Sequence, residues 1–289
     1  MGKAMEIRGS ALVTGASRGI GRAVVLELLE RGFPVVATMR DPGAGDALRE
    51  RAGANRERLR IARLDVERPE TIQIPDDLQV LVNNAGTEAE YLPLEHAPMA
   101  QWRGVFETNV FGLVEVTRRA ATILRERGEG VVCNISSASL LFPMPFYSVY
   151  RASKAAVAAL GESLRSELAP FGVRVLEVMP GPVETDMLAG SDREPEATAH
   201  TAYRPLANWA WESRRGMDGG FTPAAQAAKA IADAIFDPKS PLRVACDPTG
   251  AAMIAAADAS AHESLQQGAL SAMSAAVMGG AEPEGDADA

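Results

Sequence analysis

A chain of 289 residues, 47% of them hydrophobic and 23% charged, has the composition of a globular protein with a substantial core. Its formal net charge of −9 at pH 7 argues against nucleic acid or an anionic membrane surface as the main partner. We find no signal peptide, no myristoylation signal and no apolar run long enough to span a bilayer. We therefore expect a cytoplasmic protein without a membrane span.

Cysteine and histidine usage gives no indication of a metal site. Cys133 and Cys246 lie far apart, each in an apolar, strand-like run, which is typical of buried thiols rather than of a disulfide or metal pair. His96, His200 and His262 have no mutual spacing typical of a zinc site. The sequence therefore predicts no bound metal.

Strand and helix patterns alternate through most of the chain, which predicts a parallel sheet covered by helices on both faces. Strands are predicted within residues 10–15, 34–40, 59–66, 79–86, 130–137, 173–181 and 241–247. Helices are predicted over residues 19–32, from about 99 to 127, after Tyr150, and over 222–237. Gly32 and Gly128 are expected to end two of these helices, and Thr222 is the expected N-cap of the last, with Pro223 in its first position.

Two regions interrupt this alternation. Residues 182–220 form a long, irregular stretch rich in Trp, Tyr, Pro and charge, which is typical of a binding loop or lid. Residues 279–289 are small and acidic, which predicts a disordered tail. We expect one domain over residues 1–278, with the loop inserted into it.

A glycine-rich loop, TGASRGIG, connects the first predicted strand to the first predicted helix. Gly15, Gly19 and Gly21 permit a tight turn and a close approach to a pyrophosphate, which the following helix N-terminus would bind through free N–H groups. The alternative is a simple glycine-rich turn. If the loop binds a dinucleotide, its other contacting residues are Ser17, Arg18 and Ile20.

The glycine spacing is G-x-x-x-G-x-G, which differs from the G-x-G-x-x-G form of many dinucleotide-binding proteins. Together with NNAG at residues 83–86, the loop resembles that of the short-chain dehydrogenase/reductase family, and the resemblance covers about residues 8–250. It implies a Rossmann-type, doubly wound α/β fold with a mostly seven-stranded parallel sheet and helices on both faces. It also implies an NAD(P)-dependent oxidoreductase that acts on CH–OH or C=O groups.

The resemblance further implies a set of cofactor contacts. Asp65 and Val66 match the positions at the adenine edge, and Val183 and Thr185 match those that bind the nicotinamide carboxamide. The remaining residues implied to contact the cofactor are Asn83, Ala85, Gly86, Pro180 and Gly181, together with the catalytic Tyr150 and Lys154.

The end of the second strand indicates which dinucleotide is bound. An NAD enzyme places a carboxylate there, and an NADP enzyme an arginine. In this chain the carboxylate position falls on Met39 and is followed by Arg40, while Arg18 adds a second guanidinium suited to a 2′-phosphate. Asp41 lies close enough to weaken this reading, and both arginines could be surface residues. We favour NADP(H) over NAD(H).

Tyr150 and Lys154 are four residues apart, so on a helix they share a face. A nearby ammonium and an oxidised nicotinamide would both favour the phenolate, and we expect them to lower the pKa of Tyr150 into a range useful for acid–base catalysis. The alternative for an isolated Tyr-x-x-x-Lys is a surface pair. Tyr147, whose residue four positions on is Arg151, is expected to form pocket wall or helix packing, with Arg151 a spectator.

The family resemblance supplies the other catalytic positions. Ser137 lies 13 positions before Tyr150 (150 − 137) and matches the serine that polarises the substrate carbonyl; Ser139 is a weaker candidate, and Ser136 is expected to point to the other side. Asn109 matches the helix asparagine that holds a water connected to the lysine. The implied tetrad is Asn109, Ser137, Tyr150 and Lys154.

The chain departs from the family pattern in two places. Only 17 residues separate Asp65 from Asn83 (83 − 65 − 1), and Pro69 and Pro75 disfavour a helix among them, so we predict that the third crossover helix is missing or cut to a turn. Leu140 and Leu141 occupy positions where glycine is common after the catalytic serine, which could narrow the substrate pocket. The ending PLRVACDPTG resembles the hydroxysteroid and retinol dehydrogenase branch.

We predict an NADP(H)-dependent carbonyl reductase or alcohol dehydrogenase for a mainly apolar small-molecule substrate. The alternatives are a dinucleotide-binding redox sensor or regulator and, less favoured, an epimerase or dehydratase. The family resemblance also implies a homodimer or homotetramer built on helix 99–127 and the helix after Tyr150. The loop side chains available to the substrate are Met187, Leu188, Tyr203, Leu206, Trp209, Trp211 and Phe221.

Overall fold

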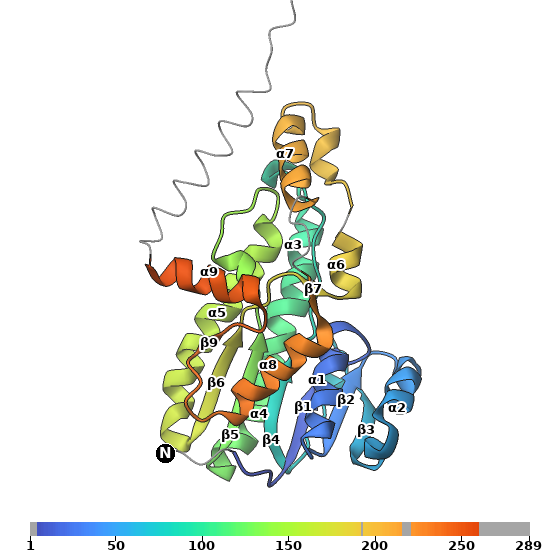
Figure 1. The fold of residues 1–289 in the computed structure, drawn as a ribbon, viewed down its shortest axis with the longest axis vertical. Coiled ribbons are helices and arrows are strands. Elements are labelled where there is room, and N and C mark those ends of the chain that lie inside the picture. The colour runs from blue at the N-terminus through green and yellow to red at the C-terminus, as the bar shows by residue number, and fades with distance from the viewer. Residues whose placement is uncertain (1–4, 192, 216–220, 260–289) are drawn as a thin grey trace, which may run out of the picture.

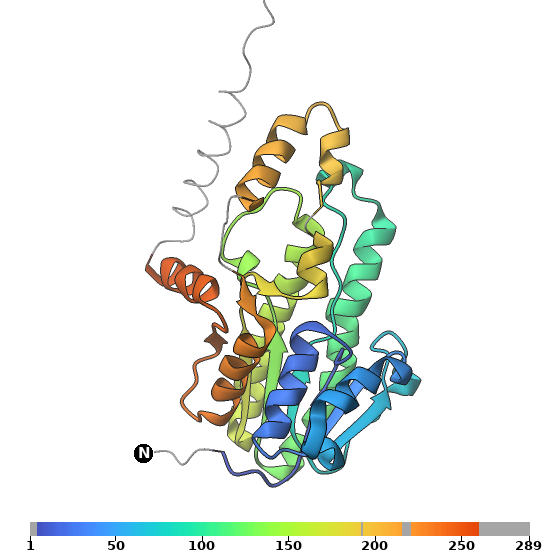
Figure 2. The same ribbon diagram turned by 45° about the vertical axis from the view of Figure 1, so that its right-hand side comes forward.

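The computed structural model describes residues 5–191, 193–215 and 221–259, and within them a seven-stranded sheet in the order β3-β2-β1-β4-β5-β6-β9 (Figures 1 and 2). Every pairing in this sheet is parallel. The sequence predicted each strand. Their bounds are β1 Ser10–Val13, β2 Val35–Met39, β3 Leu59–Arg63, β4 Leu78–Asn83, β5 Gly130–Ile135, β6 Val173–Val178 and β9 Arg243–Val244.

Helices cover both faces of the sheet, as predicted, because neighbouring strand residues point to opposite faces. Ala11 and Val13 of β1 pack under α1 (Gly19–Glu30), α2 (Asp46–Ala52) and α8 (Ala224–Phe236). Leu12 packs on the other face with α4 (Leu113–Arg127) and α5 (Ser148–Leu168). The strand order reverses direction between β1 and β4, and at such a point the carboxyl ends of the strands open a crevice for ligands.

Of the three helix termini predicted from the sequence, the two C-terminal ones are confirmed. Gly32 and Gly128 follow α1 and α4 with φ angles of 98° and 75°, the left-handed conformation that glycine adopts at low cost. The prediction for Thr222 is wrong: Thr222 and Pro223 form β8, which pairs with β7 (Val183–Glu184), and α8 begins at Ala224. The Thr222 N–H donates to the Pro182 carbonyl, so the residue is part of a strand pair rather than a cap.

The third crossover helix is reduced to one 3₁₀ turn, η3 (Pro69–Thr71), as predicted. Proline lacks the N–H that a longer helix would need. The Thr71 hydroxyl accepts the Asp65 N–H at 2.9 Å, so a side-chain hydrogen bond holds this short connection against the end of β3.

The predicted helix over 99–127 is interrupted by a π-helical segment. It consists of α3 (Met99–Phe106), the π-helical η5 (Glu107–Gly112) and α4. Asn109 lies in the wide turn, a kind of irregularity that occurs often at functional sites. A Cβ on Gly112 would come within 2.7 Å of the Val66 side chain, so this turn packs directly on the end of β3. The sequence pattern did not predict the π turn.

Residues 182–220 are more regular than predicted. Their described part contains β7, α6 (Asp186–Ser191), the 3₁₀ helix η8 (Glu196–Ala199) and α7 (Arg204–Arg215). In Figure 1, α7 lies beyond the carboxyl ends of the strands, and α9 (Pro248–Ala259) crosses the same end of the molecule. The predicted disordered tail, residues 279–289, and His262 lie outside the described residues.

Cys133 and Cys246 are free and buried, as predicted. His96 and His200 stack at a centroid distance of 3.8 Å. Within 5–191, 193–215 and 221–259, no group of three or more His, Cys, Asp or Glu side chains could hold a metal ion. Across the same ranges, no helix has the length and apolar character needed to cross a bilayer.

Candidate active site

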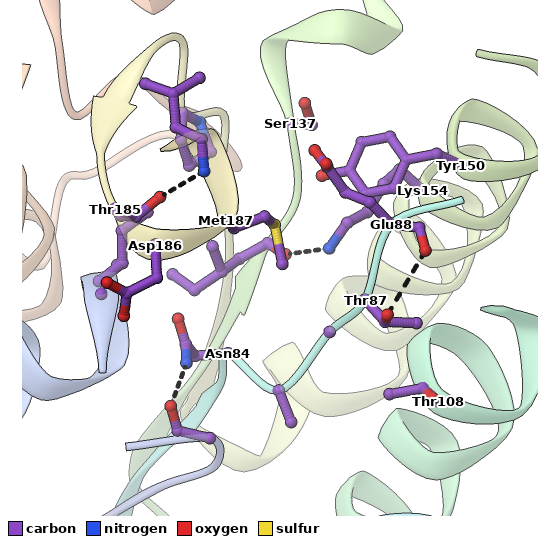
Figure 3. A pocket seen from close by; sticks show the side chains of 18 of the residues that line it. Asn84, Thr87, Glu88, Thr108, Ser137, Tyr150, Lys154, Thr185, Asp186 and Met187 are labelled. Carbon is purple, nitrogen blue, oxygen red and sulfur yellow. Dashed lines mark hydrogen bonds between the residues drawn. The ribbon is translucent and has the colours of Figure 1, made fainter. Parts of the chain in front are cut away.

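A cavity of about 870 Å³ opens at the carboxyl ends of the strands (Figure 3). Strand ends, the glycine loop, the start of α5, and residues of α6 and α9 line it. The predicted site residues that border it are Gly15, Ser17, Arg18, Gly19, Ile20, Arg40, Asp65, Val66, Ala85, Gly86, Ser137, Tyr150, Lys154, Pro180, Gly181, Val183 and Thr185. Gly21, Asn83 and Asn109 do not border it.

The glycine loop has the shape of a phosphate cradle. Gly15 and Gly19 have φ angles of 65° and 55°, and a Cβ on Gly15 would lie 2.8 Å from the Cα of Ala85. The helix α1 begins at Gly19, and the preceding Arg18 makes no side-chain cap hydrogen bond. The first N–H groups of such a helix have no intrahelical acceptor and favour an anion. These residues therefore fit the pyrophosphate of a dinucleotide.

Gly21 acts through packing rather than by bordering the cavity. A Cβ there would lie 2.3 Å from Nδ2 of Asn84. The Asn84 amide donates to the carbonyls of Thr14 and Gly15 at 2.9 and 3.0 Å, and it borders the cavity. The third glycine thus makes room for the side chain that fixes the loop, a role the sequence analysis did not assign to Asn84.

Asn83 differs from the sequence-based expectation. Its side chain is buried inside the molecule, where Nδ2 donates to Thr117 Oγ1 at 2.8 Å and to Asn134 Oδ1 at 2.9 Å. Because side chains alternate along a strand, Asn83 faces α4 while Asn84 reaches the cavity. This alternation could have shown from the sequence that only one of the two residues faces the cavity.

The end of β2 places guanidinium groups at one end of the cavity. Arg40 is exposed, and no carboxylate lies within ion-pair distance of it in the part of the chain that the structure describes. The Arg18 Nε atom lies 4.0 Å from Oδ2 of Asp186. The Asp41 carboxylate accepts the Gly43 N–H at 2.9 Å and caps a 3₁₀ turn, and it also borders the cavity.

Tyr150, Lys154 and Ser137 converge on the opposite part of the cavity (Figure 3). Tyr150 and Lys154 lie in the first two turns of α5, and the Lys154 ammonium is 5.7 Å from the centroid of the Tyr150 ring. The ammonium also donates to the Ile135 carbonyl at the end of β5, at 2.8 Å. This bond fixes a buried charge beside the phenol.

The electrostatics of these groups differ from the sequence-based expectation. Burial raises the pKa of the Tyr150 phenol, the Glu88 carboxylate raises it further, and a hydrogen bond with Ser137 opposes the shift. Burial lowers the pKa of the Lys154 ammonium to about 8, while Glu88 and Glu177 act in the opposite direction. The protein's own side chains therefore do not lower the pKa of Tyr150; the expected lowering depends on positive charge brought by a ligand.

Asn109 does not border the cavity, but its side chain connects two elements of the site through hydrogen bonds. Its Oδ1 accepts the Thr87 N–H at 2.8 Å, and its Nδ2 donates to the Thr87 carbonyl at 2.9 Å and to Ser153 Oγ at 3.0 Å. A Cβ on Gly86 would lie 3.3 Å from Asn109 Oδ1 and 3.8 Å from Lys154 Nζ. The π turn thus ties the loop after β4 to the catalytic helix.

The serine loop after β5 is also braced. The Ser137 hydroxyl donates to Ser139 Oγ at 2.9 Å. Arg151, the expected spectator, donates Nε to the Ser139 carbonyl at 2.8 Å and so links this loop to α5. Ser136, expected to point to the other side, also borders the cavity, and its hydroxyl has no hydrogen-bond partner among the described residues.

Tyr147 and the loop residues divide between the cavity and its surroundings. Tyr147 borders the cavity and stacks on Tyr91 at a centroid distance of 4.7 Å, which agrees with its expected role as pocket wall. Among the expected substrate-loop residues, Met187, Leu188 and Phe221 line the cavity. Tyr203 and Leu206 instead pack in an apolar cluster with Tyr91, and Trp209 and Trp211 do not line the cavity.

Asp247 is a buried carboxylate that the sequence analysis did not single out. Its Oδ2 accepts the Gly181 N–H at 2.7 Å, and its Oδ1 accepts the Gly250 N–H at 2.8 Å. A Cβ on Gly181 would lie 2.5 Å from Oδ1. Asp247 therefore fastens the turn after β6 to the beginning of α9.

Comparison with known sequences gives a match over most of the sheet. A model described as short chain dehydrogenase matches residues 10–196. A Bacillus subtilis protein described as the uncharacterized oxidoreductase YusZ is 39% identical over 192 residues, which cover 63% of this chain and 67% of that protein. The segment that the family model matches includes the glycine loop, the NNAG segment, Ser137, Tyr150 and Lys154.

Comparison with solved structures extends the match to nearly the whole chain. A short-chain dehydrogenase from Streptomyces avermitilis has a TM-score of 0.74 at 31% identity and covers 96% of this chain and 100% of its own. A chain from Burkholderia cenocepacia in complex with NADP has a TM-score of 0.70 at 26% identity, with coverages of 92% and 99%. One from Burkholderia phymatum in complex with NAD has a TM-score of 0.72 at 26% identity, with coverages of 88% and 93%.

Proposed function

The chain belongs to the short chain dehydrogenase family of NAD(P)-dependent oxidoreductases, and on that premise we propose an NADP(H)-dependent reductase or dehydrogenase acting on a carbonyl or secondary alcohol. One observation carries the proposal. Ser137, Tyr150 and Lys154 border the same cavity as the glycine cradle, so a dinucleotide in the cradle and a substrate at the phenol would meet.

A nicotinamide dinucleotide held by the glycine loop would supply or accept the hydride of the proposed reaction. Tyr150 gives its proton to the carbonyl oxygen in the reductive direction, or takes the hydroxyl proton in the oxidative direction. The Ser137 hydroxyl donates to the substrate oxygen while negative charge develops there. Lys154 holds a buried positive charge beside the phenol through its bond to the Ile135 carbonyl, and Asn109 holds the loop and helix on which these groups depend.

The preference for NADP(H) rests on the end of β2. Arg40 follows β2 directly, Arg18 lies in the glycine loop, and both border the cavity; two guanidiniums would suit a dianionic 2′-phosphate. Asp41, the residue that could favour the ribose hydroxyl of NAD, is engaged with the Gly43 N–H. Met39, in the expected carboxylate position, is buried and apolar.

The substrate is proposed to be mainly apolar. Met187 and Leu188 of α6 and the neighbouring Phe221 line the substrate end of the cavity. A dinucleotide-binding redox sensor is the second candidate function, and it would not need a phenol, a serine and a lysine converging on one point.

The deciding experiment is a panel of ketones and secondary alcohols, followed by the absorbance of NADPH and NADH. We expect turnover of at least one ketone or alcohol in the panel. The reaction should be faster with NADPH than with NADH. Tight dinucleotide binding with no turnover across the panel would favour the sensor.

We also propose a homodimer or homotetramer. Phe111 in η5 and Val114 in α4 are exposed apolar side chains, 58% and 36% accessible, on the helices that the family resemblance implicates in assembly. Analytical ultracentrifugation should give at least twice the chain mass, and a purely monomeric protein would contradict the proposal.

A further inference from the structure

Asp247 and the helix that follows it have no part in the reaction proposed above. Asp247 is 7% exposed and does not border the cavity. The helix α9 begins at the next residue and contributes Thr249 and Met253 to the cavity wall. In Figure 1 this helix crosses the carboxyl ends of the strands. The hydrogen bonds of Asp247 connect it to the part of the cavity that is proposed to hold the nicotinamide.

The two oxygens of the Asp247 carboxylate accept hydrogen bonds from two different segments. Oδ1 accepts the Gly250 N–H at 2.8 Å and so caps the first turn of α9. Oδ2 accepts the Gly181 N–H at 2.7 Å, and Gly181 belongs to the turn after β6, which borders the cavity. One side chain therefore caps a helix and holds a turn of the site.

The packing around this carboxylate is close on both sides. A Cβ on Gly181 would lie 2.5 Å from Asp247 Oδ1. A Cβ on Gly250 would lie 2.5 Å from the Met179 carbonyl oxygen and 3.1 Å from Asp247 Oδ2. Both segments therefore approach the carboxylate to a distance that glycine permits and a larger residue does not. A shift of α9 relative to the turn would break these contacts.

The other side of the same turn is bonded to the serine loop. The Ala138 N–H donates to the Pro180 carbonyl at 2.9 Å, and Ala138 directly follows Ser137. The helix α9 packs against η6 (Ala138–Leu140), the 3₁₀ turn of that loop. The turn after β6 is therefore held between the serine loop and the carboxylate, and α9 contacts both.

We propose that Asp247 is a positioning residue that fixes the turn at Gly181 against the serine loop, so that a nicotinamide bound at the turn stays aligned with the Ser137 hydroxyl. This inference rests on the proposed oxidoreductase function and deepens it. A misplacement of about 1 Å between reacting groups can lower a rate about 10²-fold. The glycine cradle and Arg40 bind other parts of the dinucleotide and do not depend on this bond. Loss of the bond should therefore lower kcat more than dinucleotide affinity.

Asp247→Ser separates the two bonds of the carboxylate. Serine is as good an N-cap as aspartate, so the bond to Gly250 is retained, but its single, shorter side-chain oxygen leaves the Gly181 N–H without an acceptor. We expect kcat to fall about 10–100-fold while the dissociation constant for NADPH, measured by fluorescence titration without substrate, changes less than about threefold. An unchanged kcat, or a loss confined to NADPH affinity, would overturn the inference.

Two further variants distinguish positioning from helix stability. Asp247→Ala removes both bonds, so kcat should fall as far as in Asp247→Ser, while the midpoint of urea denaturation should be lower because the cap is also lost. Ala256→Gly weakens α9 at an exposed position nine residues after Asp247 (256 − 247) and should leave kcat unchanged. An equal fall of kcat in Ala256→Gly would show that the stability of α9 determines the rate, which would contradict the inference.

Hydrogen exchange on the wild-type protein tests the same connection if a variant fails to fold. Saturating NADPH should slow amide exchange over residues 249–253 by at least about threefold, because the turn that contacts the dinucleotide is bonded to the start of α9. Unchanged exchange there, with slowed exchange in the glycine loop, would overturn the inference. Slowed exchange in α9 without turnover of any ketone or alcohol would contradict the oxidoreductase function and retain the connection through Asp247.

Discussion

The two ends of the cavity are built differently. At the cofactor end, the loop after β1 and the end of β2 present backbone N–H groups and arginines that follow directly from short sequence motifs. At the substrate end, Glu88, Tyr147 and Met187 come from three separate segments, and Tyr91 connects part of them by donating to Glu88, stacking on Tyr147 and bonding to Glu196 of η8. A site built from backbone groups can therefore be predicted from local sequence, whereas a site built from side chains of distant segments depends on long-range packing.

Tyr150→Phe, where the two ends meet, should have the largest effect. Removing the hydroxyl that donates and accepts the proton should lower kcat by about 10²–10⁴-fold, the usual contribution of general acid–base catalysis. The glycine cradle is untouched, so the dissociation constant for NADPH, measured by fluorescence titration, should change less than about twofold. Near-wild-type turnover would show that the phenol is not the proton carrier.

Arg40→Asp tests the cofactor end by charge. A charge-assisted hydrogen bond contributes about 1.5–3 kcal/mol, so we expect KM for NADPH to rise about 10–100-fold while KM for NADH changes little or falls. Arg56→Asp is the control, since Arg56 is exposed and away from the cavity. Equal changes for both cofactors would rule out contact with a 2′-phosphate.

Gly21→Ala tests whether close packing against the glycine loop determines the shape of the cofactor end of the cavity. The new methyl would collide with the Asn84 amide, whose Nδ2 would lie 2.3 Å away. Overpacking of this kind costs about 1–3 kcal/mol, measured as the free energy of unfolding, and NADPH affinity should fall with it. Gly104→Ala, in α3, is the contrast: nothing lies within 4 Å of its Cβ position, and stability should rise by about 0.5–1 kcal/mol. Equal destabilisation by both substitutions would remove the distinction.

The pH dependence of the free energy of unfolding should reflect the lowered pKa of Lys154, which is buried where the two ends of the cavity join. Burial lowers the pKa of Lys154 from 10.5 to about 8, so between these values the unfolded chain binds more protons than the folded one. The free energy of unfolding should therefore rise with pH, by about 1–2 kcal/mol between pH 8 and 10. Above its ordinary pKa of 10, the raised pKa of Tyr150 acts in the opposite direction. Denaturation curves of Lys154→Met should lack the rise.

The apolar pattern of the sequence predicts regular strands and helices but not irregular turns. The seven strands of the large sheet, the glycine helix ends and the shortened third crossover followed from apolar periodicity, glycine and proline, whereas the short pair β7–β8 did not. The π turn at Asn109 did not, because its sequence is compatible with an ordinary helix and only packing against Val66 and Thr87 selects the wider turn. The sequence could have distinguished Asn83 from Asn84. Side chains alternate along a strand, so only one of these two neighbours can face the cavity.

The strands of the parallel sheet, the phosphate cradle and the Tyr150–Lys154 pair could be predicted from the sequence, because apolar runs, glycine spacing and a four-residue separation are local patterns. The charges around the reacting phenol follow only from the packed fold. Burial and Glu88 raise the pKa of Tyr150, and Glu88 reaches it from a loop 62 residues away in the chain (150 − 88). Electrostatic effects depend on distance and burial in three dimensions, and a one-dimensional pattern contains neither.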